Sequence, residues 1–182
     1  MGLRSVVVTE GCQLEVSQRL KRMTTILDKL VREPTMALST MQDIGGCRAV
    51  LATRDEVHRV ERRLRKNRAP LDHYDYITSP RASGYRAIHI VVGYTDGAGT
   101  RRAIEVQLRT TVMHEWAVTV ERLSGRLRDD LKSGHGPAAL LDFLAAISEA
   151  MALEERGEAV PEGLSRRISA LRQDALPWLA RP

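Results

Sequence analysis

Three parts of the chain carry charged side chains in an arrangement that phosphate-transfer chemistry could use. A basic cluster spans residues 19 to 32, one acid, Asp43, precedes a pair of glycines, and a second acid, Glu105, lies within an alternating segment. Phosphoryl transfer depends on positioning and on neutralising the charge of the transferring oxygens, so it needs cations around the phosphates and a metal ion held by carboxylates. The residue types at these positions are therefore compatible with a site for a phosphorylated ligand.

Glu105 is the most informative of these residues. The stretch 101–110 alternates apolar with polar residues, and Gln107 and Arg109 follow Glu105 on the same side. That period is typical of a half-buried strand, in which a carboxylate is disfavoured unless its face of the sheet is a site. The alternative is an ordinary sheet-surface glutamate that pairs with Arg109 or Arg86.

The elements that would position these residues follow from the period of the apolar residues. Strands are predicted at 12–21, where a helical period also fits, at 47–52, and in an antiparallel hairpin of 86–94 and 101–110. Helices are predicted at 24–32, capped by Thr24 or Thr25, at 56–66, capped by Asp55, and at 112–127, 138–156 and 161–175. The predicted fold class is α+β, a mixed β-sheet flanked by helices with further helices at the C-terminus.

Length and composition favour one globular unit with a helical appendage. The chain has 182 residues, 43% of them hydrophobic and 28% charged, and its apolar runs are too short to span a bilayer. We expect one main domain over 1–132 and a helical extension over 133–182 that packs on it or forms an oligomer interface. Because no export leader is recognisable, the expected location is the cytoplasm, with no membrane partner.

The net charge of +5 comes mostly from arginine. Arginine presents a planar fork that matches phosphate oxygens, so the charge is compatible with a nucleotide, RNA or a membrane surface as partner. The alternative is that the arginine content reflects genomic base composition and carries no functional meaning.

Four segments occur in the order that characterises one enzyme family. They are Arg19 to Lys29, Asp43-Ile44-Gly45-Gly46-Cys47-Arg48, the loop from Asp75-Tyr76-Ile77 through Gly84-Tyr85 to His89, and Ile104-Glu105-Val106-Gln107-Leu108-Arg109-Thr110. Over residues 19 to 117 this order resembles the synthetase domain of the RelA/SpoT family, in its small, synthetase-only form. The resemblance implies a nucleotidyltransferase-like synthetase fold and makes the main domain over 1–132 the synthetase domain. It also implies ATP-dependent transfer of pyrophosphate to the 3′-hydroxyl of GDP or GTP, which makes the alarmone (p)ppGpp of the stringent response.

The resemblance further implies a role for each residue that matches a motif. Asp43 and Glu105 would hold Mg²⁺, and Glu105 would take the proton of the acceptor hydroxyl. ATP would be bound by Arg19, Lys21, Thr25, Lys29 and Arg48. The acceptor nucleotide, its guanine stacked on Tyr85, would be bound by Arg81, Ser83, Tyr85, His89, Gln107 and Arg109. Without the resemblance, Asp43 is a turn or cap residue, the cations form a solvated basic face, and His89 is a sheet histidine.

Departures from the family pattern leave the acceptor open. Arg81 stands where lysine is usual, Ser83 stands where asparagine is common, and the segment 72–75 is neither the usual basic nor the usual acidic version. Three readings therefore remain: a (p)ppGpp synthetase, a toxin-type relative that makes adenosine alarmones or pyrophosphorylates tRNA 3′ ends, and an inactive nucleotide- or RNA-binding domain. Binding of tRNA is compatible with the sequence but not indicated by it. Family members are often homotetramers, so the resemblance implies a homo-oligomer.

Overall fold

The computed structural model describes residues 2–13, 15–21, 23–38, 41, 44–95, 97 and 99–180. The chain divides into two compact units, and each is described by itself. The first comprises 1–74 with 87–110, and the second comprises 75–86 with 111–182. The predicted division into 1–132 and 133–182 stays a prediction.

A five-stranded mixed sheet organises the first unit. Its strand order is β1-β2-β5-β4-β3, with β1 at Glu15–Leu20, β2 at Gly45–Leu51, β5 at Arg101–Thr110, β4 at Ile88–Thr95 and β3 at Asp72–Asp75. β2 runs parallel to β5, whereas β1 pairs with β2 and β4 pairs with β5 in antiparallel register. The predicted mixed sheet and the predicted hairpin of its last two strands are confirmed. β3 was not predicted.

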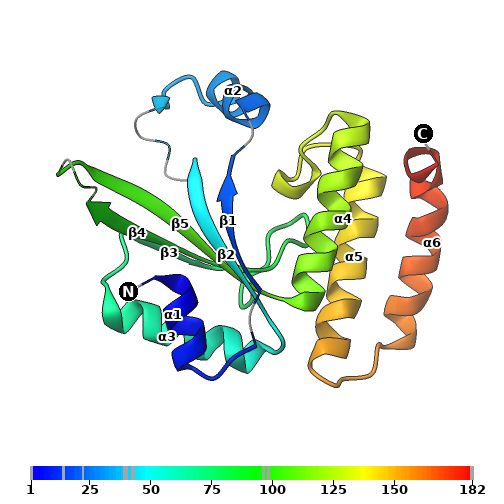
Figure 1. Cartoon of the computed structure of the whole chain (residues 1–182). Coiled ribbons are helices and arrows are strands. Elements are labelled where there is room, and N and C mark those ends of the chain that lie inside the picture. Colours follow the sequence, from blue (N-terminus) through cyan, green and yellow to red (C-terminus); the bar gives the residue numbers. More distant parts are fainter. Residues whose placement is uncertain are drawn as a thin grey trace. The chain divides into compact units, whose positions relative to one another are not determined.

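One face of this sheet is covered by α1, Leu3–Thr9, and α3, Arg54–Asn67, which also contact each other (Figure 1). The apolar residues of the strands alternate onto that face, as the period of β5 predicts. The core between helices and sheet consists of side chains that are almost fully buried: Val6, Val7, Ala49, Leu51, Val57, Val60, Ile88, Ile90, Val106 and Leu108. The polar residues of β5 consequently share the opposite face.

Both predicted helix caps are wrong, because each helix begins earlier in the chain than the sequence predicts. α3 begins after Thr53, whose side-chain oxygen accepts a hydrogen bond from the backbone N–H of Glu56 at 3.2 Å. Asp55 lies inside the first turn instead, where its negative charge suits the helix N-terminus. α2 spans Met23–Arg32, so Thr24 and Thr25 are helical residues and not caps.

Three helices and a loop make up the second unit. α4 spans Thr111–Leu127, a short 3₁₀ turn η2 spans Leu131–Ser133, α5 spans Ala138–Glu155 and α6 spans Glu162–Leu179. α5 packs against both α4 and α6, and the indole N–H of Trp116 on α4 donates to the carbonyl of Leu144 on α5 at 3.1 Å. The predicted C-terminal helices are thereby confirmed. None of the helices in the described ranges has the length and apolar character needed to cross a bilayer.

Candidate functional site

A row of residues across three strands forms the centre of the candidate site. In the sheet register, Arg19 of β1 lies opposite Gly46 of β2, and Gly46 lies beside Glu105 of β5. A Cβ atom on Gly46 would lie 2.5 Å from the carbonyl oxygen of Glu105, so any other residue would force a backbone shift. With no side chain between them, Arg19 reaches across Gly46, and its Nη1 atom lies 3.8 Å from Oε2 of Glu105.

Glu105 is held from three directions. Nδ1 of His89 on β4 lies 2.8 Å from Oε1, the Gln107 amide donates to Oε2 at 2.6 Å, and Arg19 provides the ion pair. The Glu105 side chain is only 14% exposed. The alternative in which Glu105 is a solvent-facing partner of Arg109 or Arg86 is therefore wrong for this structure.

The amide of Gln107 connects Glu105 to two further arginines. Its Oε1 atom accepts hydrogen bonds from Nε and Nη2 of Arg48 at 3.4 Å each, and from Nη2 of Arg109 at 3.1 Å. The same amide donates to Glu105, so Gln107 is oriented by cations on one side and a carboxylate on the other. One face of the sheet thus brings together six residues predicted for the site: Arg19, Arg48, His89, Glu105, Gln107 and Arg109.

These partners control the ionisation of Glu105. Burial alone raises the pKa of the carboxyl group, but the hydrogen bond and charge of His89, the Gln107 amide and the charge of Arg19 together outweigh it. The pKa falls from 4.5 to about 2. Glu105 is therefore ionised at any pH near neutrality, and its carboxylate offers permanent negative charge to a cation or a hydroxyl group.

A stability prediction follows from this lowered pKa. A carboxyl group whose folded-state pKa is below its unfolded value stabilises the fold above pH 4.5, and the stabilisation is lost as the pH falls toward 2. We expect the difference in free energy of unfolding between wild type and Glu105→Gln to shrink by about 2 kcal/mol from pH 6 to pH 3. Urea unfolding of both proteins across that range measures it. A pH-independent difference would show that the three partners do not stabilise the ionised form.

The other residues predicted to bind ATP lie at the end of β1 and beyond it. Lys21 follows β1, and its backbone N–H donates to the carbonyl of Ile44 at 2.8 Å. Thr25 and Lys29 are one turn apart on α2, so they share a flank of that helix. In Figure 1, α2 lies beyond the end of β1 that carries Arg19. Their assignment to ATP stays a prediction.

The predicted metal site is only partly within the described part of the chain. Asp43 lies outside the described residues, so its place in the site is not given. Within the parts of the chain that the structure describes, no three His, Cys, Asp or Glu side chains are grouped so as to hold a metal ion. Mg²⁺ requires only one or two carboxylates beside substrate phosphates, and the ionised oxygens of Glu105 are of the type it prefers. Glu105 therefore fits the predicted ion as one of its ligands.

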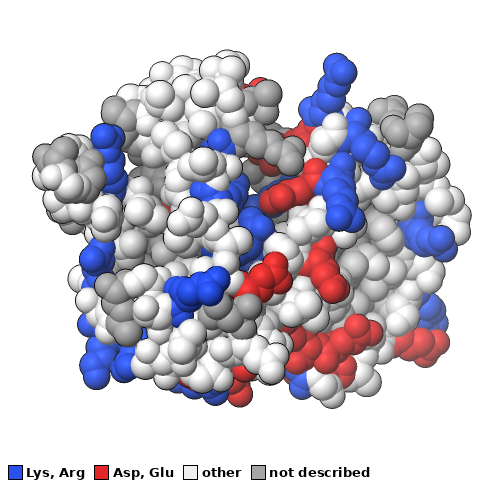
Figure 2. All heavy atoms as spheres, in the orientation of Figure 1, with Lys and Arg blue, Asp and Glu red and all other residues white. Residues whose placement is uncertain are grey.

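The face drawn in Figure 2 carries charged side chains of both signs, with lysine and arginine lying among acidic and uncharged residues. Binding of tRNA stays a prediction that the sequence permits but does not indicate.

The predicted acceptor residues are divided between the two units. His89, Gln107 and Arg109 belong to the first, whereas Arg81, Ser83 and Tyr85 belong to the loop of the second. This loop starts with a turn closed by Asp75, which accepts hydrogen bonds from the backbone N–H groups of residues 77 and 78 at 2.9 and 3.0 Å. Further along, the guanidinium of Arg81 lies over the ring of Tyr76, 4.5 Å from its centroid.

Tyr85 is fully buried, which the sequence did not indicate. Its ring lies 5.9 Å from that of Tyr76 and 6.4 Å from that of Trp116, both at tilted angles typical of aromatic pairs. The residue before it, Gly84, has a positive φ of 86° and packs closely against α5. The loop is therefore folded back on the helices, and stacking of a base on Tyr85 requires covering side chains to move. That role stays a prediction.

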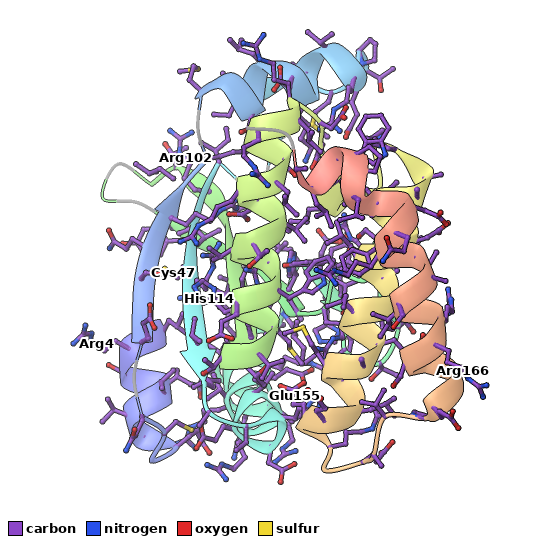
Figure 3. All side chains as sticks on the ribbon, turned by 90° about the vertical axis from the view of Figure 1, so that its right-hand side faces the viewer. Arg4, Cys47, Arg102, His114, Glu155 and Arg166 are labelled. Carbon is purple, nitrogen blue, oxygen red and sulfur yellow. The ribbon has the colours of Figure 1, made fainter. Side chains whose placement is uncertain are left out.

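A buried polar network fixes this loop to α5, and sequence reasoning missed it. Ser148 donates to the carbonyl of Gly84 at 2.5 Å and accepts from Nε of Arg86 at 3.2 Å. Nη1 of Arg86 lies 2.8 Å from the carboxylate of Glu155, the last residue of α5 (labelled in Figure 3). Both side chains of this ion pair are under 10% exposed. In the sequence, Arg86 is 62 positions from Ser148 and 69 positions from Glu155, so no local pattern indicates these contacts and only the fold reveals them.

Comparisons with known proteins agree with these features. Residues 18–123, more than half of the chain, match the family described as "Region found in RelA / SpoT proteins". The GTP pyrophosphokinase YjbM of Bacillus subtilis is 35% identical over 129 residues, which is 64% of this chain and 61% of that protein. The chain thus spans less than two thirds of the length of this relative.

Solved structures show the same fold. The small alarmone synthetase 1 of Bacillus subtilis, bound to its product pppGpp, superimposes with a TM-score of 0.72 at 28% identity, covering 85% of this chain and 84% of that one. A GTP pyrophosphokinase family protein from Streptococcus pneumoniae gives a TM-score of 0.66 at 25% identity and covers 96% of this chain and 88% of the other. The α+β prediction is confirmed by both.

Proposed function

Since the chain belongs to the RelA/SpoT family, we propose that it transfers pyrophosphate from ATP to the 3′-hydroxyl of GDP or GTP and makes (p)ppGpp. The observation that carries the proposal is the ionised Glu105, flanked by Arg19 and connected through Gln107 to Arg48 on one sheet face. Such a face offers both the negative charge and the cations that phosphoryl transfer uses. The names of the relatives support the same activity.

In the proposed reaction the 3′-oxygen of the acceptor attacks the β-phosphorus of ATP. The bond between that phosphorus and the α–β bridging oxygen breaks, AMP leaves with this oxygen, and the 3′-hydroxyl gives its proton to the Glu105 carboxylate. Arg19 and Arg48 bind the phosphate oxygens and neutralise their charge. Lys21, Thr25 and Lys29 complete the ATP site at the end of β1 and on α2.

Glu105 orients the attacking hydroxyl by accepting its hydrogen bond. With a pKa of about 2, Glu105 is a weak proton acceptor in the free protein, because general bases work best with a pKa near the operating pH. Phosphate oxygens that come close to Glu105 add negative charge beside it and raise the pKa of the carboxyl group, whereas a bound Mg²⁺ lowers it.

Asp43 and Glu105 would hold Mg²⁺, which supplies further positive charge to the phosphates when bound. The acceptor is proposed to contact His89, Gln107 and Arg109 on the sheet and Arg81, Ser83 and Tyr85 in the loop. Assembly as a homo-oligomer and a cytoplasmic location remain parts of the proposal.

Thin-layer chromatography with γ-labelled ATP tests the proposal. GDP, GTP, ADP and deacylated tRNA are offered in parallel as acceptors, each with Mg²⁺ and with chelator. Label is expected to appear in a guanosine product with GDP or GTP, and chelator is expected to abolish it. Transfer confined to ADP or tRNA would replace the proposal with the toxin-type reading. No transfer to any acceptor would indicate a binding domain.

A further inference from the structure

The ring of Tyr85 is covered by a lysine that the family motifs do not include. Nζ of Lys132, in η2, lies over this ring, 4.6 Å from its centroid. The backbone of Lys132 is held beside the loop, because the Ser83 hydroxyl donates to its carbonyl oxygen at 2.8 Å. Nζ also lies 3.4 Å from a carboxylate oxygen of Glu121 on α4, and that side chain is 46% exposed. The ammonium group is thus shared between a buried ring and a carboxylate near the surface.

A base cannot stack on the face of the Tyr85 ring that Lys132 covers while Nζ occupies this position. Stacked carbon atoms approach to about 3.5–4.0 Å, so the base would occupy the layer that Nζ now occupies. The anchored backbone limits how far the lysine can withdraw. A base in that layer displaces the ammonium group, and the side chain of Lys132 is long enough to bring its three donors to the edge of that base.

The chemistry of the ammonium group determines which base it can contact there. Lysine has three N–H donors and no acceptor. Guanine presents two acceptors, O6 and N7, on one edge, whereas adenine replaces O6 with an N6 amino donor. A lysine at that edge is attracted to guanine and is opposed by the amino group of adenine.

We infer that Lys132 is a specificity-determining residue of the acceptor site, where it selects a 6-oxopurine nucleotide over an adenine nucleotide by donating to O6 and N7. The inference rests on the proposed function, because that proposal places the acceptor base on Tyr85. It addresses the acceptor choice that the motifs leave open, since it favours GDP or GTP over ADP.

Equilibrium binding of GDP, inosine diphosphate and ADP to the full chain without ATP tests the inference. Lys132→Met keeps the length of the side chain but removes its charge and donors. We expect the ratio of GDP affinity to ADP affinity to fall by about 5-fold to 150-fold, the discrimination that a good contact to a base edge provides. Inosine diphosphate shares O6 and N7, so its affinity should fall as that of GDP does. Lys132→Arg, which keeps the donors, should retain the preference.

Lys66→Met, at an exposed lysine on α3, is the matched control and should leave the ratio of GDP affinity to ADP affinity unchanged.

An unchanged ratio in Lys132→Met, or equal changes for GDP and ADP, would overturn the inference. If thermal unfolding shows that Lys132→Met does not fold, Lys132→Ala is measured under the same criterion. If wild type prefers GDP to ADP in binding but transfers no pyrophosphate, the proposed function alone is refuted. If wild type transfers pyrophosphate to GDP but Lys132→Met keeps the same ratio of GDP affinity to ADP affinity, this inference alone is refuted.

Discussion

Glu105→Gln is expected to lower the rate of pyrophosphate transfer to GDP or GTP by about 10²–10⁴-fold, toward the upper end of that range. Removal of a general base alone typically has an effect of this size, and loss of a carboxylate ligand to the metal ion adds to it. ATP binding should persist, because the cations that bind its phosphates are unchanged. Single-turnover kinetics measure the rate of the transfer step, and equilibrium binding of ATP shows separately whether the ATP site is intact.

The control for this variant is Glu15→Gln, which makes the same change at an exposed position of β1. It should turn over like wild type. Thermal unfolding must accompany both variants, because glutamine at position 105 replaces an ionised group that His89 and Arg19 contact. A folded Glu105→Gln protein within a few-fold of wild type on every acceptor would remove Glu105 from the reaction.

The position of Glu105 was predictable because strand alternation depends only on neighbouring residues. The period of 101–110 placed Glu105, Gln107 and Arg109 on one face, and the structure confirms it. The contact with Arg19 was not predictable from the period, because it depends on the register of three strands and on the missing side chain at Gly46. The local sequence pattern predicts on which face of the sheet a side chain lies, whereas the side chains that it contacts depend on how the strands pair in the assembled sheet.

The elements that were missed have weak local signals. α1 contains three consecutive valines, which are poor helix formers, so its helical state depends on burying Val6 and Val7 against the rest of the first unit. β3 has only four residues, Asp72 to Asp75, with no apolar alternation. The cap of α3 was misplaced because Thr53 and Asp55 are both good cap residues, and only the hydrogen bond from Glu56 distinguishes them.

The acceptor loop shows the limit of motif reasoning. The motif identifies Tyr85 as an aromatic residue that follows a glycine, which suggests an available ring. The structure instead covers the ring with Tyr76, Trp116 and Lys132 and ties the loop to α5 through Arg86. These contacts come from segments distant in the sequence, so no pattern within the motif could indicate them.

Glu155→Ala is expected to destabilise the fold by about 3–5 kcal/mol. It would leave the guanidinium of Arg86, which is 4% exposed, without the carboxylate that balances its charge, and removing one partner of a buried ion pair has an effect of this size. Because Arg86 follows Tyr85 and binds Ser148, which in turn binds Gly84, the loop should lose its anchor as well. Urea unfolding measures the first effect, and the Michaelis constant for the acceptor, relative to that for ATP, measures the second.

Glu149→Ala on the same helix provides the matched control. Glu149 pairs with Arg167 at 3.6 Å, but both side chains are more than half exposed, so its loss should cost about 0–1 kcal/mol. Replacing both buried partners, as in Arg86→Met with Glu155→Leu, should recover much of the lost stability, since no unbalanced charge then remains in the interior. If Glu155→Ala destabilises the protein no more than Glu149→Ala does, the Arg86–Glu155 pair does not hold the acceptor loop on α5. If the double variant is stable but its acceptor Michaelis constant is raised selectively, the pair positions the loop beyond any contribution to stability.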